Sequence, residues 1–226
     1  MPESNTLRCE RVVPTAKPEL ATTLERAVTK FTGMEPLSIS SHGDRCCQLA
    51  QEWFRAQSRA HHEISGLPAP WLRRRWNWGP CERPAHWCEV MNRTNIDCNQ
   101  LAALSVESMA AVNEPAVVAQ IIGFYDDSSV ENWVHYWRNN GGDYWVSDHS
   151  CYHEAMAVGS PGSSDIRIWD PTAESFSEER PLAGFGSIAA LRICDDGGSP
   201  LCHDGFFHWR GHFLPAGKWT TVAQMD

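Results

Sequence analysis

The sequence predicts an α+β fold, in which helices come first and an antiparallel β-sheet follows. Segments with helical periodicity occupy the chain up to about residue 112. A run of β-branched and apolar residues begins at Ala116, and further short strand-like segments follow it. No internal repeat divides the chain, so we expect its 226 residues to form a single domain.

The composition is that of a globular protein, with 42% hydrophobic and 21% charged residues. The net charge of -9 argues against a nucleic-acid partner, because phosphate binding requires a basic surface. No segment has the apolar length of a signal peptide or a membrane span, so we expect a cytoplasmic protein without a membrane partner. The nine cysteines are an odd number, which favours free thiols over a disulfide framework.

Two helices are expected in the N-terminal part, after an irregular, proline-containing arm over residues 1–18. The first covers residues 20–31, and the second covers residues 44–62 with Asp44 at its start. Residues 66–88 are rich in proline, tryptophan and arginine, and we expect them to form a long loop or lid.

The helix predicted next begins at Cys98, with Asp97 as its capping residue, and runs to about Val112. The first strand after it covers residues 116–125, and residues 129–142 are expected to be a helical or turn insertion. The remaining predicted strands form an antiparallel set, over residues 144–159, 165–171, 187–194 and 205–215.

The hairpin formed by "CYHEAMAV" and "DIRIWD" contains the most informative spacing. If the two strands pair across the turn at residues 159–164, Val158 faces Asp165 and, further out, His153 faces Asp170. Cross-strand neighbours lie about 5 Å apart, so the carboxylate can orient the imidazole. The hairpin therefore predicts a histidine held by an aspartate.

Cys98 is the predicted nucleophile, whose thiol such a histidine would deprotonate. A thiol at a helix N-terminus lies near unpaired backbone amides and the positive end of the helix dipole, which we expect to lower its pKa. The amide of Cys98 would also point towards an oxyanion formed beside the sulfur. The sequence thus predicts catalytic residues Cys98, His153 and Asp170, in that order.

These motifs resemble the transglutaminase-like branch of the papain-like thiol enzymes. The resemblance covers residues 95–172 and rests on "DCNQLAALS", "PAVVAQIIGFY", "YHEAMAV" and "IWDPT". It implies a Cys-His-Asp triad at Cys98, His153 and Asp170, on a helix packed against an antiparallel sheet. Unlike eukaryotic transglutaminases, the chain is short and has no aromatic residue directly after the cysteine. The family includes peptidases, deamidases, acyltransferases and inactive members.

The resemblance also suggests a tryptophan that donates its indole N–H to the oxyanion. Eleven tryptophans are present, and Trp87 and Trp78 lie in the segment before Cys98 as candidates for an oxyanion or acyl-pocket role. A simple covering role at the sheet edge is an equal alternative.

A zinc site is the competing chemistry. Cys81, His86 and Cys88 form one group of ligand-type residues, and His149, Cys151 and His153 form another. No CxxC pair occurs and both spacings suit tetrahedral coordination poorly, so we expect no metal and no cofactor. A metal on the second group would also occupy the predicted base.

We therefore expect cysteine-dependent acyl transfer through a thioester intermediate. The expected partners are a small-molecule or carrier-bound acyl substrate and an amine acceptor, with amide formation as the outcome. Hydrolysis of an amide bond is the first alternative, and a non-catalytic binding module that keeps the fold is the second. The sequence does not indicate an oligomeric state.

Overall fold

The fold is described from a computed structural model of the whole chain. The described residues are 18–41, 43–62, 69, 71–79, 86–124, 139, 146–147, 150–159, 165–177 and 187–221. Most of the predicted arm at 1–18, most of the insertion at 129–142 and the turn at 160–164 lie outside them. The described part combines helices with an antiparallel sheet, so the α+β prediction is confirmed at this level.

The described helices agree with prediction where the sequence has strong periodicity. They are α1 (Pro18–Phe31), α2 (Arg45–His62), α3 (Leu72–Arg75), α4 (Trp87–Asn92) and α5 (Cys98–Ala110). The amide of Cys46 donates to Oδ1 of Asp44 at 2.7 Å, which makes Asp44 the cap that was predicted for α2. The short helices α3 and α4 were not predicted.

The main sheet is antiparallel and has the strand order β11-β8-β3-β5-β6-β7, with β4 paired to β5. A parallel pair, β1 and β2, precedes α5, and β9 and β10 form a separate hairpin. The strands are β1 (Asn77–Trp78), β2 (Asn95–Ile96), β3 (Ala116–Phe124), β4 (Val146–Ser147), β5 (Ser150–Gly159), β6 (Ile166–Asp170), β7 (Ser175–Phe176), β8 (Ser187–Cys194), β9 (Phe206–Trp209), β10 (His212–Pro215) and β11 (Thr220–Thr221).

Helix α5 begins at Cys98 because its first turn is closed by a capping box. Oδ1 of Asp97 accepts the amide of Asn99 at 3.0 Å, and Oε1 of Gln100 accepts the amide of Asp97 at 2.8 Å. This reciprocal pairing satisfies amides that the helix itself leaves unbonded. The predicted cap and helix start are therefore confirmed.

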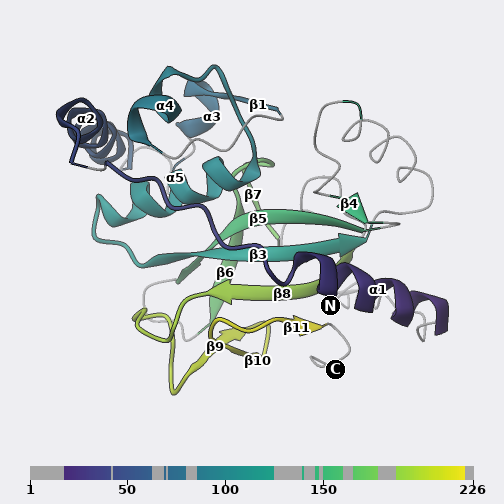
Figure 1. Cartoon of the computed structure of the whole chain (residues 1–226). Helices are drawn as coiled ribbons and strands as arrows, with labels where there is room; N and C mark the ends of the chain where they lie inside the picture. Colours follow the sequence, from purple (N-terminus) through teal and green to yellow (C-terminus); the bar gives the residue numbers. More distant parts are fainter. Residues whose placement is uncertain are drawn as a thin grey trace, which may run out of the picture.

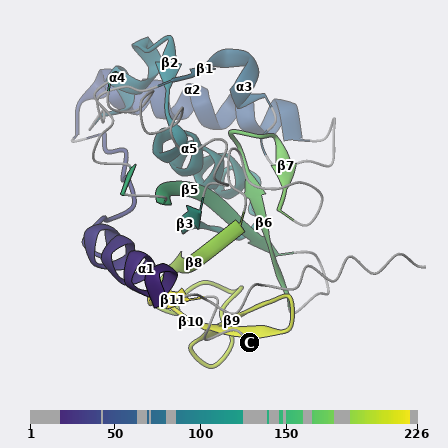
Figure 2. The same cartoon turned by 90° about the vertical axis from the view of Figure 1, so that its right-hand side faces the viewer.

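Helix α5 is buried on nearly all sides because it lies between two layers (Figures 1 and 2). On one side Leu101 and Leu104 join the aromatic cluster under α2, α3 and α4. On the other side Met109 packs with Met156 and Trp169 of the sheet. A helix in this position can be apolar all round, and residues 98–105 of α5 are all buried.

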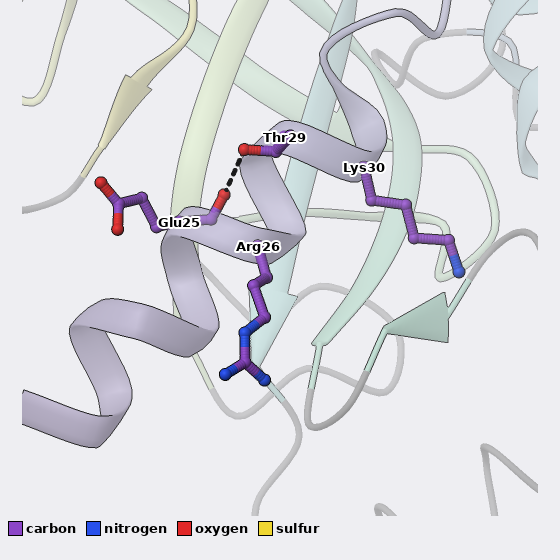
Figure 3. Close-up of a pocket in the computed structure, with 4 residues that line it drawn as sticks. All are labelled: Glu25, Arg26, Thr29 and Lys30. Atoms are coloured by element: carbon purple, nitrogen blue, oxygen red, sulfur yellow. Dashed lines mark hydrogen bonds between the residues drawn. The ribbon is translucent and has the colours of Figure 1, made fainter.

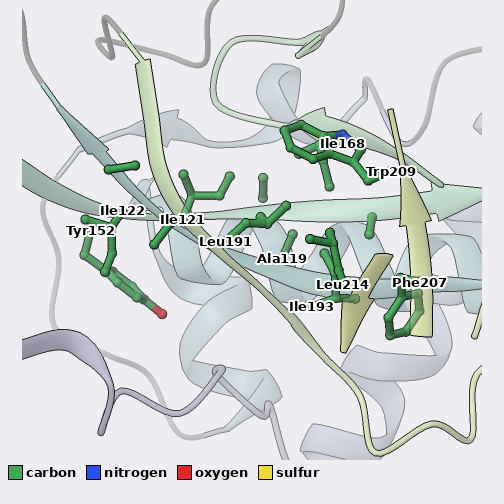
Figure 4. Packing of buried hydrophobic residues seen from close by; sticks show 14 of the residues in the cluster. Ala119, Ile121, Ile122, Tyr152, Ile168, Leu191, Ile193, Phe207, Trp209 and Leu214 are labelled. Atoms are coloured by element: carbon green, nitrogen blue, oxygen red, sulfur yellow. The ribbon is translucent and has the colours of Figure 1, made fainter. Parts of the chain in front are cut away.

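The opposite face of the sheet packs against the β9–β10 hairpin. Figure 4 shows this core, in which Phe207, Trp209 and Leu214 of the hairpin meet Ile168 and Leu191 of the sheet. A parallel bridge between Asp165 and His208 joins the hairpin to the start of β6. The sheet is thus covered on both faces.

Residues 66–88 were predicted to be a loop or lid, and their described part is more ordered than that. It contains α3, β1 and the start of α4, and Trp71, Trp76 and Trp87 are buried around Phe54. These short elements were not predicted, because the many prolines and tryptophans of the segment leave no clear helical or strand periodicity. Their aromatic side chains form core in the described part of this segment.

Candidate active site

The two faces of β5 separate the candidate residues into two groups. Side chains alternate along a strand, so Tyr152, Glu154 and Met156 share one face, while His153 and Ala155 share the other. Met156 packs against Met109 of α5, so the first group lies on the face that α5 covers. His153 is on the face of the β9–β10 hairpin, beside its cross-strand partner Ile121.

His153 and Asp170 are in contact. Nε2 of the imidazole lies 3.1 Å from Oδ1 of the carboxylate, and the exposed fractions of the two side chains are 7% and 0%. The contact is electrostatic, because the ring N–H is not aligned well enough for a hydrogen bond to this oxygen.

The predicted register of this hairpin was wrong by two residues. Val158 pairs with Arg167 and not with Asp165, and the described ladder ends at Met156 and Trp169. A shift of two residues keeps every side chain on its face, so His153 and Asp170 still share a face and meet diagonally. The last pair before the turn is Gly159 with Ile166, whereas the predicted last pair was Val158 with Asp165.

Asp170 also begins a turn, as an Asp-Pro sequence suggests. Its Oδ1 accepts the amide of Thr172 at 2.9 Å and the amide of Ala173 at 3.4 Å. The same oxygen therefore fixes the chain after β6 and approaches the ring of His153. The turn holds the carboxylate in place before any substrate binds.

Cys98 is the first residue of α5, and it is 4% exposed. Burial raises the pKa of its thiol well above 9.0, and the carboxylates of Asp97 and Glu154 raise it further. A hydrogen bond with the backbone of Glu154 lowers the pKa, but by less. The predicted lowering of this pKa is therefore wrong, because desolvation and two nearby carboxylates outweigh the helix N-terminus.

The structure brings His153 to Asp170, whereas the thiol of Cys98 contacts the residue next to His153. The sulfur bonds the backbone of Glu154, and electrostatic effects of Asp97, Glu154 and Cys151 raise its pKa. Glu154 lies on the stretch of β5 beyond the described β5–β6 ladder, which stops at Met156. The sulfur thus lies beside the backbone of β5, next in sequence to the histidine of the His153–Asp170 pair.

A buried polar network lies on the face of α5, and sequence reasoning missed it. Oε1 of Glu154 accepts the hydroxyl of Tyr152 and Nε2 of Gln120, the latter at 3.3 Å. Nε of Arg192 donates to Oε1 of Gln120 at 2.6 Å, and both side chains donate to the carbonyl of Met34. Burial, and then the Glu154 carboxylate, raise the pKa of Tyr152. The available signal was a glutamate and a glutamine inside otherwise apolar strands.

The two candidate tryptophans occupy different positions. Trp78 of β1 pairs with Ile96 of β2, two positions before Cys98, so it lies near the start of α5. Trp87 is fully buried against Phe54, and its indole nitrogen has no hydrogen-bond acceptor among the described residues. The oxyanion role of either side chain stays a prediction.

The zinc alternatives fall partly outside the described residues, which do not include Cys81 or His149. Within the described ranges, no group of three histidine, cysteine, aspartate or glutamate side chains is arranged to hold a metal ion. His86 instead caps α4 and lies 3.4 Å from the hydroxyl of Ser40.

A hollow of about 450 Å³ lies beside α1, away from these residues. Its described lining is Glu25, Arg26, Thr29 and Lys30, all from one helix (Figure 3). Thr29 donates its hydroxyl to the carbonyl of Glu25 at 2.8 Å. The hollow includes none of the predicted catalytic residues.

Comparisons with protein families, with curated proteins and with solved structures find no significant match to this chain. Among the described residues, no helix has the length and apolar character needed to cross a membrane. The functional argument therefore depends on the geometry of the site.

Proposed function

We propose that this chain is a thiol acyltransferase of the papain-like, transglutaminase-like class, with Cys98 as nucleophile, His153 as base and Asp170 as its orienting group. The observation that carries the proposal is the buried pair of His153 and Asp170 at 3.1 Å. An imidazole beside a carboxylate is a proton acceptor of fixed orientation. The sulfur of Cys98 bonds the backbone of the adjacent residue, Glu154, and provides the nucleophile.

In the proposed reaction, the sulfur of Cys98 attacks the carbonyl carbon of an acyl thioester or amide. His153 takes the thiol proton and returns it to the leaving thiol or amine, and a thioester to Cys98 remains. An amine then attacks that thioester, which forms an amide and frees the thiol. Water in place of the amine gives hydrolysis, the alternative outcome.

Because the pKa of Cys98 is raised, the base must remove the thiol proton during the attack on the substrate. A protonated thiol is a weak nucleophile, so its proton must leave as the carbon–sulfur bond forms. The sulfur bonds the backbone of Glu154, directly after His153, so we place the proposed proton transfer at an edge of β5. The relevant edge is the part of β5 beyond the described β5–β6 ladder, which ends at Met156. The proposed proton transfer from Cys98 to His153 takes place there as the substrate binds.

A second candidate function is a non-catalytic binding module that keeps this fold. The burial and raised pKa of Cys98 favour it. Under this alternative, His153 and Asp170 only close the turn after β6.

Acylation of the protein distinguishes the two functions. The full chain is incubated with acetyl and benzoyl thioesters of N-acetylcysteamine, and its intact mass is measured before and after addition of methylamine. We expect one acyl group on Cys98 that is lost in Cys98→Ser and kept in Cys151→Ser, a matched change at another buried cysteine. Equal acylation of Cys98→Ser and the unaltered chain would refute the thiol mechanism. Absence of any adduct would favour the binding module.

A further inference from the structure

We propose that Cys47 and Cys88 are an oxidisable dithiol whose disulfide links α2 to α4. This site is independent of Cys98 and of the proposed acyl transfer. It joins two helices of the layer that covers α5 (Figure 1). Both cysteines are free thiols in the structure.

The distance between the two sulfurs is the main observation. Sγ of Cys47 lies 2.8 Å from Sγ of Cys88, although the residues are 41 positions apart in the sequence. A disulfide bond is about 2.05 Å long, so the sulfurs need to approach by only about 0.8 Å. Small adjustments of the side chains can supply this movement.

A backbone hydrogen bond also holds the pair together. The amide of Cys88 donates to Sγ of Cys47 at 3.4 Å, so the sulfur of α2 is bound at the first turn of α4. Cys47 is 4% exposed and belongs to the aromatic cluster around Phe54, whereas Cys88 is half-buried at its border. A small oxidant can thus reach Cys88 first, and Cys47 then lies directly behind it.

Cys46 adds a third thiol next to the pair. It is exposed at the start of α2, and its side chain, like that of Cys47, hydrogen-bonds Cys88. These two contacts raise the pKa of Cys88 to about 12. This raised pKa keeps Cys88 protonated near neutral pH, so its oxidation is expected to be slow and to accelerate at alkaline pH.

The oxidation uses a low-molecular-weight disulfide, such as glutathione disulfide, as its oxidant. Cys88 loses its proton and attacks one sulfur of glutathione disulfide, so that a mixed disulfide forms and one glutathione leaves. Cys47 then loses its proton, attacks the Cys88 sulfur and displaces the second glutathione. Overall the two thiols lose two electrons and two protons, and glutathione disulfide becomes two glutathione thiols.

The full chain, equilibrated in glutathione buffers of increasing oxidised fraction, provides the test. We expect peptide mapping to find a Cys47–Cys88 disulfide and the intact mass to fall by two hydrogens. The cross-link closes a long loop, so the oxidised protein should melt roughly 10 °C higher than the reduced one. Both effects should vanish in Cys47→Ala and in Cys88→Ser.

Cys202→Ser is the matched control, because Cys202 is also half-buried and free, and it should leave both effects intact. Cys46→Ser should also still form the cross-link, since Cys46 is not one of the bonded pair. A disulfide that maps to Cys46 and Cys88 would overturn the proposal. So would a stable glutathione adduct on Cys88 that Cys47 does not displace, which peptide mapping of the unaltered chain detects even if a variant misfolds.

Discussion

The imidazole of His153 and the carboxylate of Asp170 meet diagonally across β5 and β6, beyond the last described pair of the ladder, Met156 and Trp169. Oδ1 of Asp170 lies 3.1 Å from Nε2 of His153 and also accepts the amide of Thr172 at 2.9 Å. One oxygen atom thus belongs both to the turn that ends β6 and to the ring contact. The fold keeps the carboxylate fixed, and the ring orientation follows from it.

Asp170→Asn separates these two roles. The amide oxygen of asparagine can still accept the amide of Thr172, so we expect the turn and the free energy of unfolding to change little. The neutral side chain no longer stabilises a charged imidazole, so the rate of Cys98 acylation should fall by roughly 10²- to 10⁴-fold. Stopped-flow acylation and urea unfolding measure the two quantities. Asp165→Asn, at the other end of β6, is the control and should alter neither.

An unchanged acylation rate in Asp170→Asn, with acylation of the unaltered chain demonstrated, would show that Asp170 serves only the turn. A large loss of stability without a specific loss of rate would lead to the same conclusion.

Slow alkylation of Cys98 is the second prediction. Its thiol is 4% exposed and its pKa is raised, so little thiolate is available to iodoacetamide near neutral pH. Exposed Cys46 should therefore be labelled well before Cys98 in the folded protein. Peptide-level mass spectrometry against time measures both rates, and urea-unfolded protein provides the reference in which both react. Faster labelling of Cys98 than of Cys46 would mean that the sulfur is open and ionised in solution.

Features that depend on residues close together in the sequence could be predicted from it. Asp97 lies directly before the first helical residue, so the cap and the start of α5 were predicted correctly, whereas the reciprocal bond from Gln100 was not predicted. The alternation of strand residues fixed which face His153 and Asp170 share. The register itself was wrong by two residues, because alternation has a period of two and cannot detect such a shift.

Tertiary contacts determined the features that sequence reasoning missed. The pKa of Cys98 depends on burial and on Glu154 of a strand that follows much later in the chain. The contacts of Arg192 with Gln120 and with Met34 span 72 and 158 positions. No local pattern encodes such partners, although a charged residue in an apolar strand indicates that a partner must exist.

The third prediction concerns the buried polar network of Tyr152, Glu154, Gln120 and Arg192. Gln120→Glu has nearly the same shape but removes the amide donor to Glu154 and places a second carboxylate beside it. Two buried carboxylates repel each other, so we expect the free energy of unfolding to fall by about 3 kcal/mol. The double variant Gln120→Glu with Glu154→Gln restores one donor and one carboxylate, which Arg192 then faces directly.

We expect this double variant to recover at least half of the lost stability, measured by urea unfolding at pH 7. If the double variant is less stable than Gln120→Glu alone, the hydrogen-bond chain from Arg192 to Glu154 does not stabilise the fold as the structure indicates.

Stability should decrease at alkaline pH, and the sign follows from the raised pKa values of buried thiol and phenol groups. Burial raises the pKa of Cys98 and Tyr152, and it raises the pKa of Cys194 from 9.0 to about 12. In the unfolded chain these groups lose their protons near their ordinary values, so above pH 9 the native state binds more protons than the unfolded state. The free energy of unfolding is thus independent of these groups below pH 9 and falls above it. Each thiol contributes about 1.4 kcal/mol per pH unit until its native pKa is reached.

Cys194→Ala tests this directly, because it removes one ionising group from the half-buried end of β8. Urea unfolding between pH 9 and pH 11 should show a slope that is shallower by about 1.4 kcal/mol per pH unit in this variant. Ile188→Val, a change of similar size on the same strand without an ionising group, should keep the original slope. Equal slopes in Cys194→Ala and the unaltered chain would mean that the Cys194 thiol titrates alike in the folded and unfolded states.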